Sequence, residues 1–153
     1  MRRETSYLSP VAPLLITEED GYITGISFRE CTESNAESPL LTETVRQLDA
    51  YFKGKLCRFT VPIRFHGTPF QEKVWNALLT IGYGQTVSYS EIARMTGNPK
   101  ASRAVGSAVH VNPIAIIIPC HRVLGKNGSM TGYAPGIPIK EKLLRLEQEG
   151  IFP

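Results

Sequence analysis

Apolar residues near the start of the chain gather in short segments of the length of β-strands. Two of these segments, Val11–Ile16 and Tyr22–Phe28, are separated by Glu18-Glu19-Asp20-Gly21. An Asp-Gly pair between apolar segments is typical of a hairpin turn, because both residues tolerate the backbone that such a turn needs. The sequence therefore predicts an antiparallel hairpin.

A helical pattern follows the hairpin. Residues 30–39 are mostly polar and predict an exposed loop. Apolar residues then recur at intervals of three and four, the spacing of one helix face: Leu40, Leu41, Val45, Leu48 and Phe52. Residues 58–65 predict a strand that closes this part of the fold, and we expect a lobe boundary at His66-Gly67.

Two helix starts in the second half carry capping signals. Thr68-Pro69-Phe70-Gln71 offers a hydroxyl cap, a proline at the first helical position and a glutamine at the third. Ser88-Tyr89-Ser90-Glu91 repeats the capping box, and Gly97 is placed to end that helix in a left-handed conformation. A short helix over 101–109 would complete a helix-turn-helix, although this spacing also occurs in proteins that do not bind DNA.

The apolar run 114–118 predicts a buried strand that leads into Cys120 and His121. A nearby imidazole increases the thiolate fraction on which cysteine nucleophilicity depends, so this pair is a candidate nucleophile and base. Adjacent residues on extended backbone face opposite sides, so the pair needs a turn or a water molecule between the side chains. The alternative is that Cys120 is simply a small buried hydrophobic residue.

Composition limits the class of protein. With 153 residues, 42% apolar and 20% charged, the chain fits one globular domain or two small lobes. No apolar run approaches the ~20 residues that span a bilayer, and no apolar signal-peptide core follows Met1-Arg2-Arg3. Three cysteines without a CxxC motif favour a reducing compartment, so we expect a cytoplasmic protein.

Charge is distributed unevenly along the chain. Residues 1–63 contain seven Lys and Arg against nine Asp and Glu, whereas residues 64–153 contain ten against five. The second half is therefore the part that would contact a polyanion, although a surplus of this size is also common on ordinary protein surfaces.

The segment Ile118-Pro119-Cys120-His121-Arg122-Val123 resembles the signature of the methylated-DNA-protein-cysteine methyltransferases, also called O6-alkylguanine-DNA alkyltransferases. The similarity runs without a gap from Phe70 to Glu147. It implies an α+β fold: a small N-terminal antiparallel sheet lobe with a helix, over residues 1–66, and a mostly helical C-terminal lobe with the helix-turn-helix, over 67–153.

The resemblance also implies a role for individual residues. Cys120 would accept the alkyl group once and irreversibly, His121 would take the thiol proton through a water molecule, Glu147 would orient His121, and Asn112 would anchor the turn that carries the site. The implied DNA and base contacts are Tyr89, which rotates the nucleotide, Arg103, which fills the gap in the base stack, and Ala101, Ser102, Val123, Tyr133 and Ala134.

The implied partner is double-stranded DNA that contains O6-alkylguanine, with O4-alkylthymine as a second substrate. We expect a monomer with no membrane association and no cofactor, and no metal, because Cys31, Cys57 and His66 are too few for a zinc site. Ala134 stands where some relatives have a serine that supports the guanine O6. Pro135 stands where glycine is common, and its ring would narrow the pocket.

Two other functions fit parts of the sequence. Alkyltransferase-like proteins bind the same lesion without repairing it, but their acceptor cysteine is replaced, whereas this chain has Cys120. A cysteine hydrolase could use Cys120, His121 and Glu147 with turnover, which requires a hydrolysable product such as a thioester. A burst of one equivalent without turnover separates alkyl transfer from hydrolysis.

Overall fold

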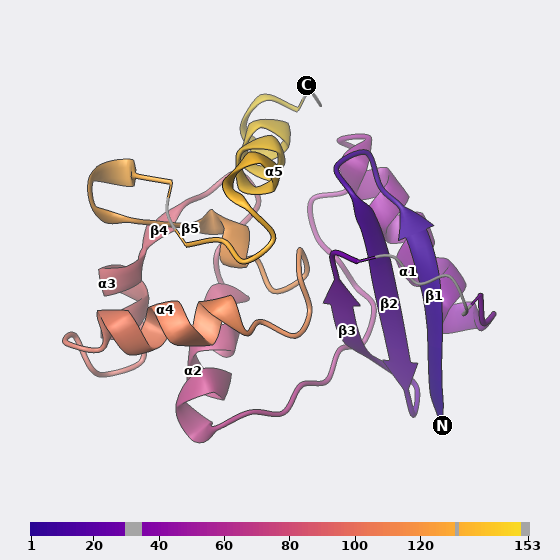
Figure 1. Cartoon of the computed structure of the whole chain (residues 1–153), viewed down its shortest axis with the longest axis horizontal. Coiled ribbons are helices and arrows are strands. Elements are labelled where there is room, and N and C mark those ends of the chain that lie inside the picture. The colour runs from indigo at the N-terminus through magenta and orange to yellow at the C-terminus, as the bar shows by residue number, and fades with distance from the viewer. Residues whose placement is uncertain (30–34, 131, 151–153) are drawn as a thin grey trace.

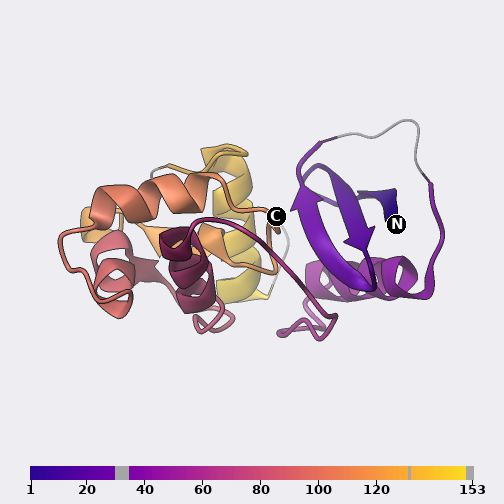
Figure 2. The same cartoon turned by 90° about the horizontal axis from the view of Figure 1, so that it is seen from below.

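Three antiparallel strands form the sheet of the N-terminal part, in the order β1-β2-β3. The strands are β1 (Arg2–Leu8), β2 (Pro13–Glu19) and β3 (Tyr22–Ser27), and helix α1 (Pro39–Phe52) packs against all three. In this computed structural model, residues 1–29, 35–130 and 132–150 are described. The sheet and α1 occupy one side of the molecule and the remaining helices occupy the other (Figures 1 and 2).

The predicted hairpin and first helix are both confirmed. Asp20 and Gly21 have φ values of 51° and 83°, the positive values that a two-residue hairpin turn requires. Strand β1 was not predicted, because its charged sequence lacks an apolar alternation. It is paired to β2 in a register that places Arg2 and Arg3 opposite Glu19 and Glu18, and opposite charges across strands favour this pairing.

The C-terminal part is mostly helical, as the α+β prediction requires. Both capping boxes form as expected, at Thr68 and Ser88, and Gly97 has a φ of 90°. The helices and strands of this part are α2 (Pro69–Leu78), β4 (Val87–Ser88), α3 (Tyr89–Met95), α4 (Ser102–His110), β5 (Val123–Leu124) and α5 (Ile137–Glu149). Strand β4 pairs in parallel with β5, which ties the start of the helix-turn-helix to the segment after Cys120.

The strand predicted over residues 58–65 does not form. Only Ile63 makes a bridge, to Ile23 of β3, with one hydrogen bond from Ile23 to Pro62 and one from Arg64 back to Ile23. Pro62 has no backbone N–H to donate, so it cannot extend a ladder in both directions. The segment instead runs as irregular chain from α1 toward α2.

The strand predicted over 114–118 is also wrong. All five residues are buried, but the chain turns back on itself at Ile116, whose φ is 72°, and Ala115 bridges to Ile118. A short apolar run shows burial but not conformation, because periodicity cannot separate a buried strand from another buried segment. The resulting loop also bridges Ile114 to Ile26 of β3 and so connects the sheet to the site.

Part of the predicted 30–39 loop, residues 30–34, lies outside the described residues, as does Cys31. Over the described part of the chain, no helix combines the length and apolar character needed to cross a membrane. The lobe boundary at His66-Gly67 stays a prediction.

Candidate active site

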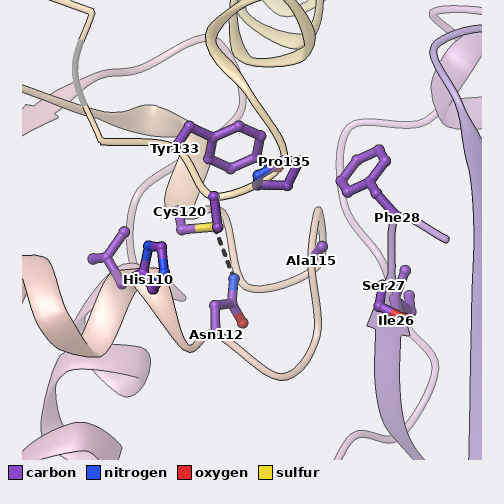
Figure 3. A pocket seen from close by; sticks show the side chains of 11 residues that line it. Ile26, Ser27, Phe28, His110, Asn112, Ala115, Cys120, Tyr133 and Pro135 are labelled. Carbon is purple, nitrogen blue, oxygen red and sulfur yellow. Dashed lines mark hydrogen bonds between the residues drawn. The ribbon is translucent and has the colours of Figure 1, made fainter.

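Cys120 begins a single 3₁₀ turn, Cys120–Arg122, directly after the buried loop. The Asn112 amide holds this arrangement together: its Nδ2 donates to Ile118 O at 2.8 Å and lies 2.9 Å from Cys120 Sγ, while its Oδ1 accepts from Ile114 N at 2.9 Å. Figure 3 shows Asn112 directed at the thiol. Asn112 therefore holds the loop closed and lies against the sulfur.

The thiol of Cys120 is protonated at rest. Burial raises its pKa to about 11, and the Asn112 amide and the Lys140 ammonium offset only part of that rise. Because the thiolate is the nucleophilic form, a reaction at neutral pH needs a group that accepts the proton. The adjoining residue, His121, is such a group.

His121 is completely buried beside Glu147, with 2.6 Å between His121 Nε2 and Glu147 Oε2. Burial lowers the pKa of His121, although Glu147 opposes the shift, so the imidazole is neutral at rest. An ionised carboxylate only accepts, so Nε2 carries the proton and Nδ1 carries the lone pair. Within the described residues, Nδ1 is buried and has no hydrogen-bond partner, which leaves it available to take a proton.

Glu147 remains ionised because several donors converge on it. Arg122 donates through Nε to Oε1 at 2.8 Å and through Nη2 to Oε2 at 3.1 Å, and Tyr51 Oη donates to Oε2 at 2.5 Å. Burial raises the pKa of Glu147, but His121 and Arg122 outweigh it and hold the pKa well below its usual range. Arg122 and Tyr51 were not predicted as site residues. The available signal for Arg122 was its position directly after His121 in the segment that resembles the family signature.

Lys140 is a further buried charge that the sequence analysis did not predict. Its side chain is 1% exposed, and Nζ donates to Val123 O at 2.5 Å. Burial lowers its pKa, and the nearby Cys120 opposes that shift. Lys140 and Glu147 are seven residues apart on α5 and so share one helix face. Its place on the face of the predicted Glu147 was the available signal for Lys140.

The thiol opens into a cavity of about 160 Å³. Four predicted site residues line it, Cys120, Asn112, Tyr133 and Ala134, together with Pro135, His110, Val109, Ala115 and, from the sheet side, Ile26, Ser27 and Phe28. Figure 3 shows Phe28 reaching from the end of β3 toward Tyr133 and Pro135. The Phe28 and Tyr133 rings meet edge to face, with centroids 6.4 Å apart, so both halves of the chain form the cavity.

A second, open hollow of about 520 Å³ lies along α4. It is lined by the predicted Tyr89 and Arg103 and by Gly106, Ser107, His110, Val111 and Gly132. His110 lines both hollows, so the helix face and the thiol cavity adjoin. Exposed Arg103 and His110 lie on the same side of α4, two turns apart. His110 was not predicted.

Three predicted contact residues lie elsewhere. Ala101 and Ser102 are half-buried at the start of α4, outside the residues that line either hollow. The Val123 side chain is fully buried, and its carbonyl already accepts from Lys140. Its remaining lone pair is the only part of Val123 that suits base recognition.

Comparisons with known proteins point to one family over most of the chain. Residues 3–65 match the family model described as the ribonuclease-like domain of 6-O-methylguanine DNA methyltransferase, and residues 69–149 match its DNA binding domain. The methylated-DNA–protein-cysteine methyltransferase of Methanosarcina acetivorans is 50% identical over 146 residues, covering 91% of this chain and 94% of that protein. The constitutive Bacillus subtilis protein of the same name is 42% identical, covering 97% and 96%.

A solved structure shows the same similarity. The crystal structure of Mycobacterium tuberculosis OGT in complex with DNA superposes with a TM-score of 0.88 at 45% identity, covering 96% of this chain and 93% of that one.

Proposed function

The chain belongs to the 6-O-methylguanine DNA methyltransferase family and performs alkyl-transfer repair of DNA, and we propose that Cys120 is the residue that accepts the alkyl group. The observation that carries this assignment is a buried thiol that lines a cavity, followed in sequence by a neutral imidazole whose Nδ1 has no hydrogen-bond partner among the described residues. The partner is double-stranded DNA with O6-alkylguanine. We further propose a monomer located in the cytoplasm.

The reaction is an SN2 displacement at the alkyl carbon. The Cys120 sulfur forms a bond to that carbon while the bond from the carbon to guanine O6 breaks, and the electron pair of the broken bond stays with the guanine. The thiol proton passes to His121 Nδ1 through a water molecule, and Glu147 stabilises the resulting imidazolium. The product is a thioether, which water does not hydrolyse, so each molecule reacts once.

Base rotation would bring the lesion to the thiol along the adjoining hollows. A base inside a duplex cannot reach a buried sulfur, and removing it from the stack costs a few kcal/mol. Arg103 on the exposed face of α4 would fill the gap in the stack, and Tyr89 beside the same hollow would press on the rotated nucleotide. His110 would lie where the base passes from one hollow to the other.

Intact-mass spectrometry after mixing with an oligonucleotide that bears one O6-methylguanine tests the reaction. We expect one methyl group per protein, located on Cys120 by peptide mapping, with no second equivalent consumed. A methyl group on another residue would contradict the assignment. Continued turnover would instead support the cysteine hydrolase, and stable binding without any adduct would support the non-repairing alternative.

Arg103→Ala should slow transfer from duplex DNA roughly 10²-fold, since the lost contact no longer offsets unstacking worth a few kcal/mol. Attack on free O6-methylguanine should change little, because the free base requires no unstacking. Single-turnover rates on both substrates measure the difference. The control is Arg145→Ala, which removes an arginine from the surface of α5. The side chain of Arg145 is 59% exposed. Equal losses on the duplex and the free base would show that Arg103 supports the fold.

Pro135→Gly should widen the range of O6 substituents that the cavity accepts. Proline fixes φ and adds ring volume at the rim opposite Phe28, whereas glycine restores backbone freedom. The ratio of O6-benzylguanine to O6-methylguanine rates should rise several-fold, and the ratio cancels any general loss of active protein. Pro10→Gly, in the exposed loop between β1 and β2, should leave the ratio unchanged. A level ratio in folded Pro135→Gly would mean that Pro135 does not select substrates.

A further inference from the structure

Tyr51 links the N-terminal part of the fold to the candidate active site. It lies near the end of α1, is 0% exposed, and is separated by 96 residues from Glu147, whose Oε2 accepts its hydroxyl at 2.5 Å. The same two helices approach each other at their C-terminal ends, where a Cβ added to Gly54 would lie 3.2 Å from Gly150 O. The end of α1 is therefore seated against the helix that carries Glu147.

The hydroxyl of Tyr51 bonds to the oxygen that faces His121. Glu147 Oε2 accepts from Tyr51 and lies 2.6 Å from His121 Nε2, whereas Oε1 accepts from Arg122 Nε and, at 3.3 Å, from Gly84 N. Burial and the neighbouring carboxylate raise the pKa of Tyr51 well above its usual value, so the phenol stays protonated and donates. Among the donors to Glu147 in the described residues, Tyr51 alone comes from the N-terminal part.

We propose that Tyr51 is a positioning residue for alkyl transfer: its hydroxyl fixes the Glu147 carboxylate in the orientation that supports proton uptake by His121. This inference rests on the proposed role of His121 as the proton acceptor. It makes the N-terminal part of the chain, which otherwise reaches the thiol cavity only through the end of β3, a participant in the proton transfer.

The hydroxyl and the ring of Tyr51 make different contacts, so the role of the hydroxyl can be tested by itself. The Tyr51 ring packs against Phe52, Phe59 and Tyr83, with centroids 5.2, 5.5 and 6.0 Å away. Tyr51→Phe keeps these contacts and removes only the hydroxyl. Arg122 and Gly84 still donate to the carboxylate, so the ion pair that neutralises Glu147 persists in the variant. A change in the rate of alkyl transfer in Tyr51→Phe then measures the contribution of the hydroxyl alone.

Tyr51→Phe should slow single-turnover transfer by about tenfold to a hundredfold, the range expected when one hydrogen bond to a charged group is lost from the transition state. Affinity for alkylated duplex should not change, because Tyr51 is buried and lines neither the thiol cavity nor the hollow along α4. The matched control is Tyr7→Phe. Tyr7 Oη also donates to a carboxylate of α1, that of Asp49 at 3.2 Å, but does not contact Glu147.

The pH dependence of transfer provides a measurement that a structural role would leave unchanged. His121 faces Glu147 and Lys140 from α5 and Arg122 from its own turn, and Tyr51 reaches it only through Glu147. Without the hydroxyl, a less well oriented carboxylate supports the imidazolium less, so the acidic limb of the rate profile should move to lower pH as the plateau falls. A limb that moves to higher pH would mean that the hydroxyl merely withdraws charge from Glu147. The proposal that Tyr51 positions the carboxylate would then be wrong.

A double-mutant cycle gives the decisive comparison. If Tyr51 acts through Glu147, Tyr51→Phe should have no further effect on transfer in the Glu147→Gln background, whereas independent effects would multiply. Equal rates for wild type and Tyr51→Phe, or equal losses in Tyr51→Phe and Tyr7→Phe, would overturn the inference. Wild-type protein that forms no adduct on Cys120 would instead overturn the proposed function, so the two failures are distinct. Thermal unfolding of each variant establishes that rates are compared between folded proteins.

Discussion

Cys120→Ala should abolish alkyl transfer and keep the binding to alkylated duplex DNA, and this is the largest effect that we expect from any single substitution. The Cys120 side chain supplies the only atom that forms the new bond, whereas Arg103 and Tyr89, the proposed contacts to the duplex, line the hollow along α4 and not the thiol cavity. Phosphate contacts supply much of the affinity for DNA and do not depend on a buried thiol. Intact mass measures transfer, and a gel-shift titration at fixed salt measures binding.

Cys57→Ala is the matched control, because Cys57 is the other free cysteine among the described residues and is exposed. It should transfer the methyl group as wild type does. The fold of Cys120→Ala should also persist, since Asn112 still donates to Ile118 O and keeps the loop closed. Any methyl adduct on Cys120→Ala would show that another residue accepts the alkyl group.

Elements with local chemical signals were predictable from the sequence. The Asp20-Gly21 turn and the two capping boxes depend on residues a few positions apart, so their hydrogen bonds form wherever the tertiary structure allows them. The same holds for the helix face that begins at Leu40. These local signals predicted the hairpin, the first helix and the starts of two later helices, whereas the α+β class as a whole was implied by the family resemblance.

Elements that depend on distant partners were not predictable. Strand β1 forms as the antiparallel partner of β2 although its own sequence has no apolar alternation, and residues 58–65 fail as a strand because Pro62 interrupts the ladder. The run 114–118 is buried on all sides between the sheet and the helices, so its apolar sequence reports burial and not its turn at Ile116. An apolar run of five residues can fill the space between the sheet and the helices without adopting the extended conformation of a strand.

The candidate site shows the same division. Asn112, Cys120 and His121 lie within ten residues of one another, and the family resemblance identifies them together with Glu147. Tyr51 and Phe28 come from the other half of the chain, and only the folded arrangement places them beside Glu147 and Tyr133. Residues that support a site from a distant part of the chain have no spacing in the sequence by which to recognise them.

Glu147→Gln should slow transfer roughly 10²- to 10⁴-fold, the share that a well-placed acid–base system contributes. The carboxylate stabilises the imidazolium that forms when His121 takes the proton, and a neutral amide cannot. The amide also places an NH₂ donor where the wild-type carboxylate oxygen accepts. That donor would face the donors of Tyr51, His121 and Arg122. Single-turnover kinetics on an O6-methylguanine duplex measure the rate, and affinity for that duplex should stay close to wild type.

The same substitution should lower the free energy of unfolding by about 3 kcal/mol at neutral pH, because Arg122 is left buried without its anionic partner. The folded pKa of Glu147 lies below its unfolded value, so the carboxylate contributes stability above the unfolded pKa and loses it as pH falls toward the folded pKa. The difference between wild type and Glu147→Gln should therefore be constant near neutrality and shrink below about pH 4. Urea titrations across this range measure it.

Glu141→Gln separates these effects from a general change on α5, because Glu141 is exposed on the same helix. It removes the same charge without touching His121 or Arg122, so both its rate and its stability should match wild type. If Glu147→Gln lost stability but transferred at the wild-type rate, Glu147 would serve only to neutralise Arg122, and His121 would act as a base without its help. If the rate fell at unchanged stability, the ion pair with Arg122 would contribute nothing to folding, and orientation of His121 would be the whole role of the carboxylate.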